Sequence, residues 1–182
     1  MTTTPEVLDL HPVPHPSAPV RQAGFPLDHP YLEQCWTPVI GPSSVLLLRR
    51  CTSLWREGAP AHVRTEDLAR QLGLGSGTAR NSPLWHTVER VVRFRFASMP
   101  AAGELGVYTE VPPVPARQLE RLPSWCRQQH ERLLSQHLDA LARLPQTAAV
   151  PPPEAAPPHV RMSRHLDRLS KPSPATKPSL SR

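Results

Sequence analysis

The sequence has few of the features that secreted and membrane proteins rely on. It contains three cysteines at wide spacings, Cys35, Cys51 and Cys126, so it predicts no disulfide framework and fits a reducing compartment. Its longest apolar run, at 45–48, is far too short to span a bilayer. The segment 1–10 has no basic stretch followed by an apolar one, so we expect no secretory signal. Together these absences predict a cytoplasmic protein without a membrane segment.

The sequence also lacks the motifs of several large enzyme classes. It has no phosphate-binding glycine loop with its lysine, no nucleophile elbow and no dinucleotide-binding glycine pattern. The adjacent carboxylates Glu66 and Asp67 are explained by a helix N-terminus, where the helix dipole favours negative charge. We therefore expect no enzymatic activity, no cofactor and no small-molecule substrate.

A metal site is the alternative chemistry that the sequence raises. Cys126 and His130 are four residues apart, which places both on one face of a helix, and His137 follows seven residues later. A structural zinc site needs a second pair of ligands close by, and none is present. The spacing therefore predicts an ordinary helix and no metal site.

Proline is abundant and unevenly distributed. The chain has 25 prolines in 182 residues, and they gather before residue 43 and after residue 144. Proline removes a backbone donor and fixes φ, so dense proline opposes helices and sheet ladders. The distribution predicts disordered proline-rich tails at 1–28 and 146–182, on either side of a single domain at 29–145.

The net charge of +6 is also uneven. Residues 1–28 carry a net charge of −2, whereas 29–145 and 146–182 each carry +4. A positive domain and a positive tail favour an anionic partner. The alternative is that this modest excess only keeps the chain soluble.

The middle of the chain shows a mainly α pattern with a small β-hairpin. Apolar residues at helical spacing predict four helices, over 45–56, 65–72, 83–93 and 124–144. A short extended link is expected at 61–64. After Arg93 the apolar period changes to two, and two alternating runs around a glycine-containing loop predict a hairpin at 94–111.

This order of elements resembles the winged helix-turn-helix domains of bacterial transcription regulators. The resemblance covers 45–55, 65–74, 82–93 and 94–111. Its sharpest part is the stretch Asp67–Leu74, which is similar to the first helix and turn of many such domains. The resemblance implies a supporting helix at 65–72, a recognition helix at 83–93 that enters the major groove, and a wing at 94–111.

Two features depart from that family. About nine residues separate Leu72 from Ser82, where the usual turn has three or four. The expected tip of the wing, 100–104, carries no basic residue, which argues against its insertion into the minor groove. The contact with DNA would then depend on the recognition helix and its flanking arginines.

The candidate contact residues are polar or basic and lie on or beside that helix. They are Arg80, Ser82, His86, Thr87, Arg90, Arg93 and Arg95. Basic side chains contact phosphates and base edges, so the sequence predicts a protein that binds double-stranded DNA, as a transcription regulator would.

The alternative function is a non-enzymatic protein-interaction module on the same scaffold. Trp85 would pack in the core of a DNA-binding domain or, if exposed, would contact a partner protein. The stripe of Leu134, Leu138 and Leu141 would likewise pack against the first helix or join two copies of the chain through helix 124–144.

Overall fold

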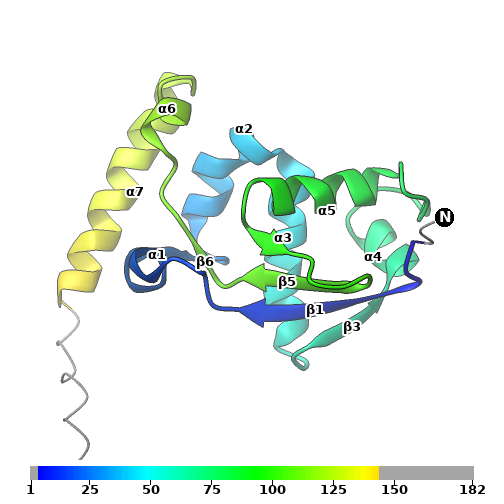
Figure 1. Cartoon of the computed structure of the whole chain (residues 1–182). Helices are drawn as coiled ribbons and strands as arrows, with labels where there is room; N and C mark the ends of the chain where they lie inside the picture. The colour runs from blue at the N-terminus through cyan, green and yellow to red at the C-terminus, as the bar shows by residue number, and fades with distance from the viewer. Residues whose placement is uncertain (1–3, 144–182) are drawn as a thin grey trace, which may run out of the picture. The chain divides into compact units, whose positions relative to one another are not determined.

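A computed structural model describes residues 4–143, and residues 1–3 and 144–182 lie outside the described part. The expected tail at 146–182 is therefore not described. About half of the described residues are helical, and most of the strands belong to one small mixed sheet (Figure 1). No helix between residues 4 and 143 is long and apolar enough to cross a membrane.

The N-terminal half contains β1 (Val7–Val13), α1 (Ala18–Ala23), β2 (Phe25–Pro26), the π-helical turn η1 (Leu32–Trp36), α2 (Thr37–Ile40), α3 (Pro42–Trp55) and β3 (Ala61–Arg64). The second half contains α4 (Thr65–Gln71), α5 (Pro83–Arg93), β4 (Ala97–Ser98), β5 (Glu104–Tyr108), β6 (Glu110–Val111), α6 (Ala116–Leu119) and α7 (Ser124–Arg143). The four expected helices are all present. The first begins earlier than expected because Pro42, which cannot donate, occupies its first turn.

The strand β1 corrects the expectation that residues 1–28 are disordered. It is an inner strand of the four-stranded sheet, whose order is β3-β1-β5-β4. It pairs antiparallel with β3, from Val7↔Arg64 to Leu10↔Ala61, and parallel with β5. The compact unit therefore begins near the N-terminus and not at residue 29.

The sequence of β1 explains why a proline-rich segment forms a strand. Leu8 and Leu10 alternate with polar residues, and both are fully buried. On the β5 side, the amide of Asp9 donates to the carbonyl of Gly103, and the carbonyl of Val13 accepts from the amide of Thr109. Because backbone groups alternate along a strand, Pro12 faces the other side, and there β3 has already ended. Its missing N–H therefore breaks no ladder bond.

The expected hairpin at 94–111 is present only in part. Its paired strands are β4 and β5, with Ala97 opposite Val107. Phe94 and Arg95 do not belong to a strand, and Arg95 has a φ of +59°. The last segment, β6, leaves this sheet and pairs with β2 near the N-terminus. The wing is thus shorter than its alternating sequence suggests.

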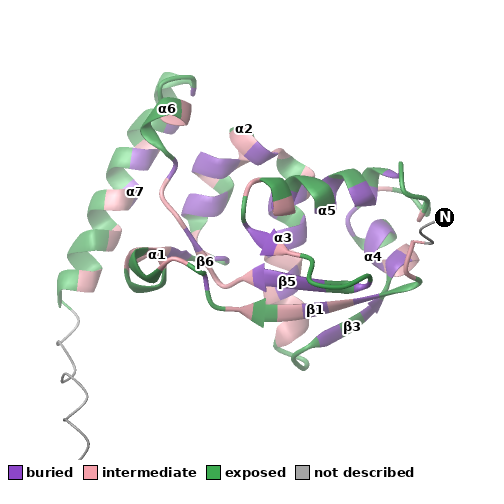
Figure 2. Cartoon of the chain, viewed as in Figure 1, coloured by how far each residue is buried: buried purple, intermediate pink, exposed green. Residues whose placement is uncertain are grey.

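The core lies between the sheet and the helices. Buried side chains from β1, β5, α3 and α5 form one cluster, and α3 passes behind the strands in the view of Figure 1. Figure 2 shows the buried sides of α3 and α5 turned inward, whereas most of α7 is exposed. Trp85 belongs to this core, with an exposed fraction of 7%, as expected if it packs rather than contacts a partner.

Two histidines attach α7 to the rest of the fold. The hydroxyl of Tyr31 accepts from the amide of Val114 and lies 2.5 Å from Nδ1 of His130. His137 donates from Nε2 to the carbonyl oxygen of Gly24 at 3.1 Å. Its ring also stacks on Phe25, with centroids 4.3 Å apart. These contacts hold α7 against the β2–η1 segment.

The burial of β1 predicts that the N-terminal segment is essential for stability. Leu10→Ala removes a fully buried side chain and should lower the free energy of unfolding by about 2–5 kcal/mol. Val7→Ala, on the same strand but 43% exposed, should change it by less than about 0.5 kcal/mol. Urea unfolding followed by circular dichroism measures both. Equal, small effects would show that β1 does not pair as described.

The histidines near α7 predict that acid weakens the fold. Burial lowers the pKa of His130 and that of His29, which also lies 5.6 Å from the ring of His137. The facing carboxylates Asp28 and Glu131 only partly oppose this. A lowered pKa means that the unfolded chain binds more protons, so stability is complete above about pH 6.5 and declines below it.

The double variant His29→Gln/His130→Gln tests this dependence. Its free energy of unfolding should fall less between pH 7.5 and pH 5.5 than that of the unmodified chain. His86→Gln, on the exposed side of α5, is the matched control and should leave the full acid response. An acid response unchanged in the double variant would contradict the assignment.

Candidate nucleic-acid interface

The helix α5 begins where the sequence predicts, because two residues favour its start. Ser82 is the N-cap, and its hydroxyl accepts from the amide of Trp85 at 3.5 Å. Pro83 occupies the first helical position, where no amide hydrogen is needed. Leu84, Val88 and Val91 then recur at helical spacing and are buried. One side of α5 is thereby fixed to the core and the opposite side is left exposed.

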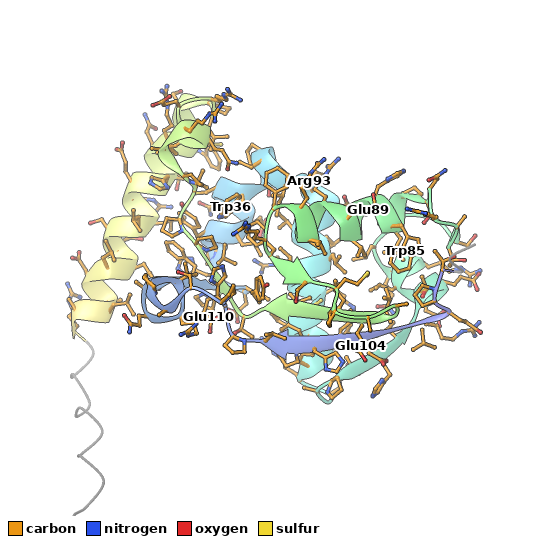
Figure 3. The ribbon with its side chains drawn as sticks, in the orientation of Figure 1. Trp36, Trp85, Glu89, Arg93, Glu104 and Glu110 are labelled. Carbon is orange, nitrogen blue, oxygen red and sulfur yellow. The ribbon has the colours of Figure 1, made fainter. Side chains whose placement is uncertain are left out.

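The exposed side of α5 carries four charged or titratable side chains: His86, Glu89, Arg90 and Arg93. They line a shallow hollow with a volume of about 270 Å³. Figure 3 shows Glu89 and Arg93 pointing outward from the helix. Among the described residues, the one contact within ion-pair distance on this side joins His86 Nδ1 and Glu89 Oε2 at 3.6 Å, and it is an ion pair when His86 is protonated. The two arginines therefore keep their charge available.

Arg90 is positioned by the start of α3. Its Nη1 lies 3.5 Å from the carbonyl oxygen of Ile40. A Cβ placed on Gly41 would lie 2.8 Å from that same nitrogen. Gly41 has a φ of +81°, so glycine is favoured here both by the backbone and by the guanidinium that passes over it.

Arg93 is positioned by the turn that follows the helix. Its guanidinium carbon lies 5.5 Å from the centroid of the Phe94 ring, a distance typical of cation–π contacts. Such a contact holds the charge near the surface without neutralising it. The role of Phe94 was missed in the sequence because its alternation with Phe96 indicated a strand.

The remaining arginines of the candidate set lie at the two ends of α5. Arg80 is exposed in the connection between α4 and α5, and Arg95 is exposed in the turn before β4. The connection is long but fixed in place, because the indole nitrogen of Trp85 donates to the carbonyl oxygen of Thr78 at 3.0 Å. The connection between Leu72 and Ser82, which is longer than the usual turn of winged helix-turn-helix domains, is therefore held in place at Thr78.

Two residues of the candidate set are buried and do not belong to the exposed side. Ser82 is 5% exposed and caps the helix. Thr87 is 4% exposed, and its hydroxyl lies within hydrogen-bond distance of Ser43 Oγ and of the Pro83 carbonyl oxygen. Their side chains serve the packing of α5, so the expectation that they contact DNA is corrected.

The arginines of α5 differ in their partners from three arginines of the α3 and α4 regions. Arg49 and Arg56 of the α3 region lie 3.4 and 3.8 Å from the carboxylates of Glu33 and Asp28. Arg70 of α4 lies 2.6 Å from Glu66. Among residues 4–143, no such carboxylate lies within ion-pair distance of an α5 arginine. Arg90 and Arg93 thus lack the acidic partners that Arg49, Arg56 and Arg70 have.

The other chemistries considered for this chain find little support in the described residues. Burial raises the pKa of the Cys35 thiol to about 11 and that of Cys51 to about 12, which keeps both in the weakly nucleophilic thiol form. Within residues 4–143, no three histidine, cysteine or carboxylate side chains gather in a way that could hold a metal ion.

Comparison with known proteins adds no assignment. The chain matches no protein-family model, no curated protein and no solved structure.

The backbone conformation of Gly41 predicts that this glycine cannot be replaced without cost. Gly41→Ala must adopt a positive φ, so it should lower the free energy of unfolding by about 1–2 kcal/mol, whereas the flexible Arg90 guanidinium can move aside. Gly58→Ala is the control, because its Cβ would meet nothing within 4 Å and its φ is not positive. Chemical denaturation compares them, and equal costs would contradict the positive φ of Gly41.

Proposed function

We propose that this chain is a DNA-binding protein with a winged helix-turn-helix architecture, whose helix α5 enters the major groove of a duplex. The observation that carries the proposal is the exposed side of α5. Its arginines, Arg90 and Arg93, are accessible and lie next to no carboxylate of another element, while the opposite side of the helix is firmly packed. A rigid helix with an accessible basic side suits the major groove.

The arrangement around α5 supports the architecture. The helices α3, α4 and α5 are followed by the β4–β5 hairpin, as in that family. The strand β1, inserted between β3 and β5, is an addition to the expected pattern. The hairpin loop at 99–103 contains no basic residue. We therefore assign the phosphate contacts to α5 and to Arg80 and Arg95 at its two ends, with the loop contributing no charge.

The proposal predicts a specific loss when the arginines of α5 are removed. Arg90→Ala/Arg93→Ala should weaken binding of the full chain to duplex DNA of random sequence. It should also flatten the slope of log K against log salt by up to about 2, since each phosphate contact contributes about 0.9. Fluorescence anisotropy over a series of salt concentrations measures both quantities.

The control removes the same charge from another element. Arg127→Ala/Arg132→Ala changes two exposed arginines of α7, which lies at the far side of α2 from α5 in Figure 1. It should retain the salt slope of the unmodified chain. Equal losses in both double variants would indicate attraction by net charge alone, and unchanged binding in the α5 variant would exclude the helix as the contact.

One observation favours protein binding as a second function. Trp125 and Leu138 of α7 are 54% and 47% exposed, and they are two of the five large exposed apolar side chains among the described residues. Aromatic residues of this kind are enriched in protein interfaces. Leu134 is half-buried in the same helix, so the stripe expected at the dimer contact is only partly accessible. Absence of duplex binding in the experiment above would leave this function as the better supported one.

A further inference from the structure

A second hollow lies on the side of α5 that faces the β4–β5 loop. Its volume is about 270 Å³, and its wall combines α5, the loop and the start of the chain. The α5 side is formed by Trp85, Val88 and Val92, and the loop side by Met99 and Ala102. In Figure 3, Trp85 lies near the N-terminal end of α5, away from Arg93. Arg90 and Arg93 do not line this hollow, although Glu89 borders both it and the hollow on the exposed side of α5.

The wall of this cavity is apolar. Most of its exposed surface is apolar, and Val88, Val92, Met99 and Trp85 are among the residues that line it. The indole N–H, which is the one polar group of the Trp85 side chain, already donates to the Thr78 carbonyl, so it needs no hydrogen-bond partner from a ligand. Burying such a surface under an apolar ligand is favourable because it removes that surface from water.

Two charged residues, Arg80 and Glu89, border the cavity. Glu89 lies 3.6 Å from His86, which neutralises the carboxylate only when the imidazole is protonated. Arg80 forms no ion pair and no side-chain hydrogen bond with any residue between 4 and 143, and it precedes the first turn of α5. The guanidinium of Arg80 is therefore free to pair with an anionic ligand.

From this combination we infer that the cavity binds a small carboxylic acid with a compact apolar body, such as a single ring. The apolar body fills the space between α5 and the loop, and the carboxylate pairs with the Arg80 guanidinium. The size is appropriate, since an apolar cavity of about 150 Å³ is enough for benzene. Neither Arg90 nor Arg93 lines the cavity, so ligand binding does not require the proposed contact of α5 with DNA, although Arg80 is assigned to both.

Benzoate is the probe, with benzyl alcohol and benzylamine as its neutral and cationic counterparts. Titration calorimetry on the full chain, without DNA, should show benzoate binding more tightly than either counterpart. Trp85 lines the cavity, so benzoate should also change tryptophan fluorescence, and Trp85→Phe should remove that change.

Variants separate the charge from the cavity. Arg80→Gln should weaken benzoate by at least about tenfold, because a charge-assisted bond is lost, and should leave benzyl alcohol unchanged. Arg95→Gln, an exposed arginine at the opposite end of α5, should bind benzoate normally. Ala102→Phe, which fills the cavity from an exposed loop position and removes no core side chain, should abolish binding of all three probes.

Several results would overturn the inference. Absence of benzoate binding would do so directly, as would benzyl alcohol or benzylamine binding as tightly as benzoate. Equal benzoate affinities for the unmodified chain and Ala102→Phe would place the ligand elsewhere. Because Arg80 is also assigned a phosphate contact, the DNA proposal is judged by Arg90→Ala/Arg93→Ala, which changes no residue that lines this cavity.

Discussion

The arrangement of this fold depends on the pairing of β1 with two strands that are distant from each other in sequence. β3 leads directly into α4, and β5 completes the hairpin that follows α5. β1 lies between them and is hydrogen-bonded to both, so it connects the two halves of the structure. The contact extends into the preceding residues, because the Thr65 amide donates to the carbonyl of Glu6 and its hydroxyl to the carbonyl of Pro5. The start of α4 is thereby fixed to the N-terminal segment.

This constraint has a consequence for α5. Its inner side packs on α3 and the sheet, so the helix cannot rotate to bring its arginines toward the carboxylates of other elements. Arg49 of α3 and Arg70 of α4 lie beside acidic partners, whereas Arg90 is held by a backbone carbonyl and Arg93 by an aromatic ring. Neither contact neutralises charge. Surface ion pairs contribute little to stability, so leaving these two arginines unpaired costs the fold little.

The sequence allowed some of these features to be predicted, and the reasons are local. α5 was predicted to the residue because its cap, its proline and its apolar spacing all lie within the helix itself. β1 was missed, although Leu8 and Leu10 alternate as a strand requires, because the nearby prolines outweighed the pattern. The position of Pro12 is harmless only because β3 ends before it, and that depends on a partner more than fifty residues away. Whether a proline-rich segment can form a strand therefore depends less on its number of prolines than on whether each proline removes an amide that the ladder needs.

The candidate site shows the same distinction between composition and placement. His86 and Thr87 are neighbours in sequence and both look suitable for DNA contact, yet the helical turn places one outside and the other against Ser43. The phase of the helix decides this, and it follows from the apolar residues on the buried side. Whether an arginine is paired cannot be read in this way, because its partner comes from another element. For Arg49 and Arg56 these partners precede α3, and for Arg90 the partner is the turn at Ile40. The basic residues of α5 were therefore identifiable from the sequence, but their availability required the fold.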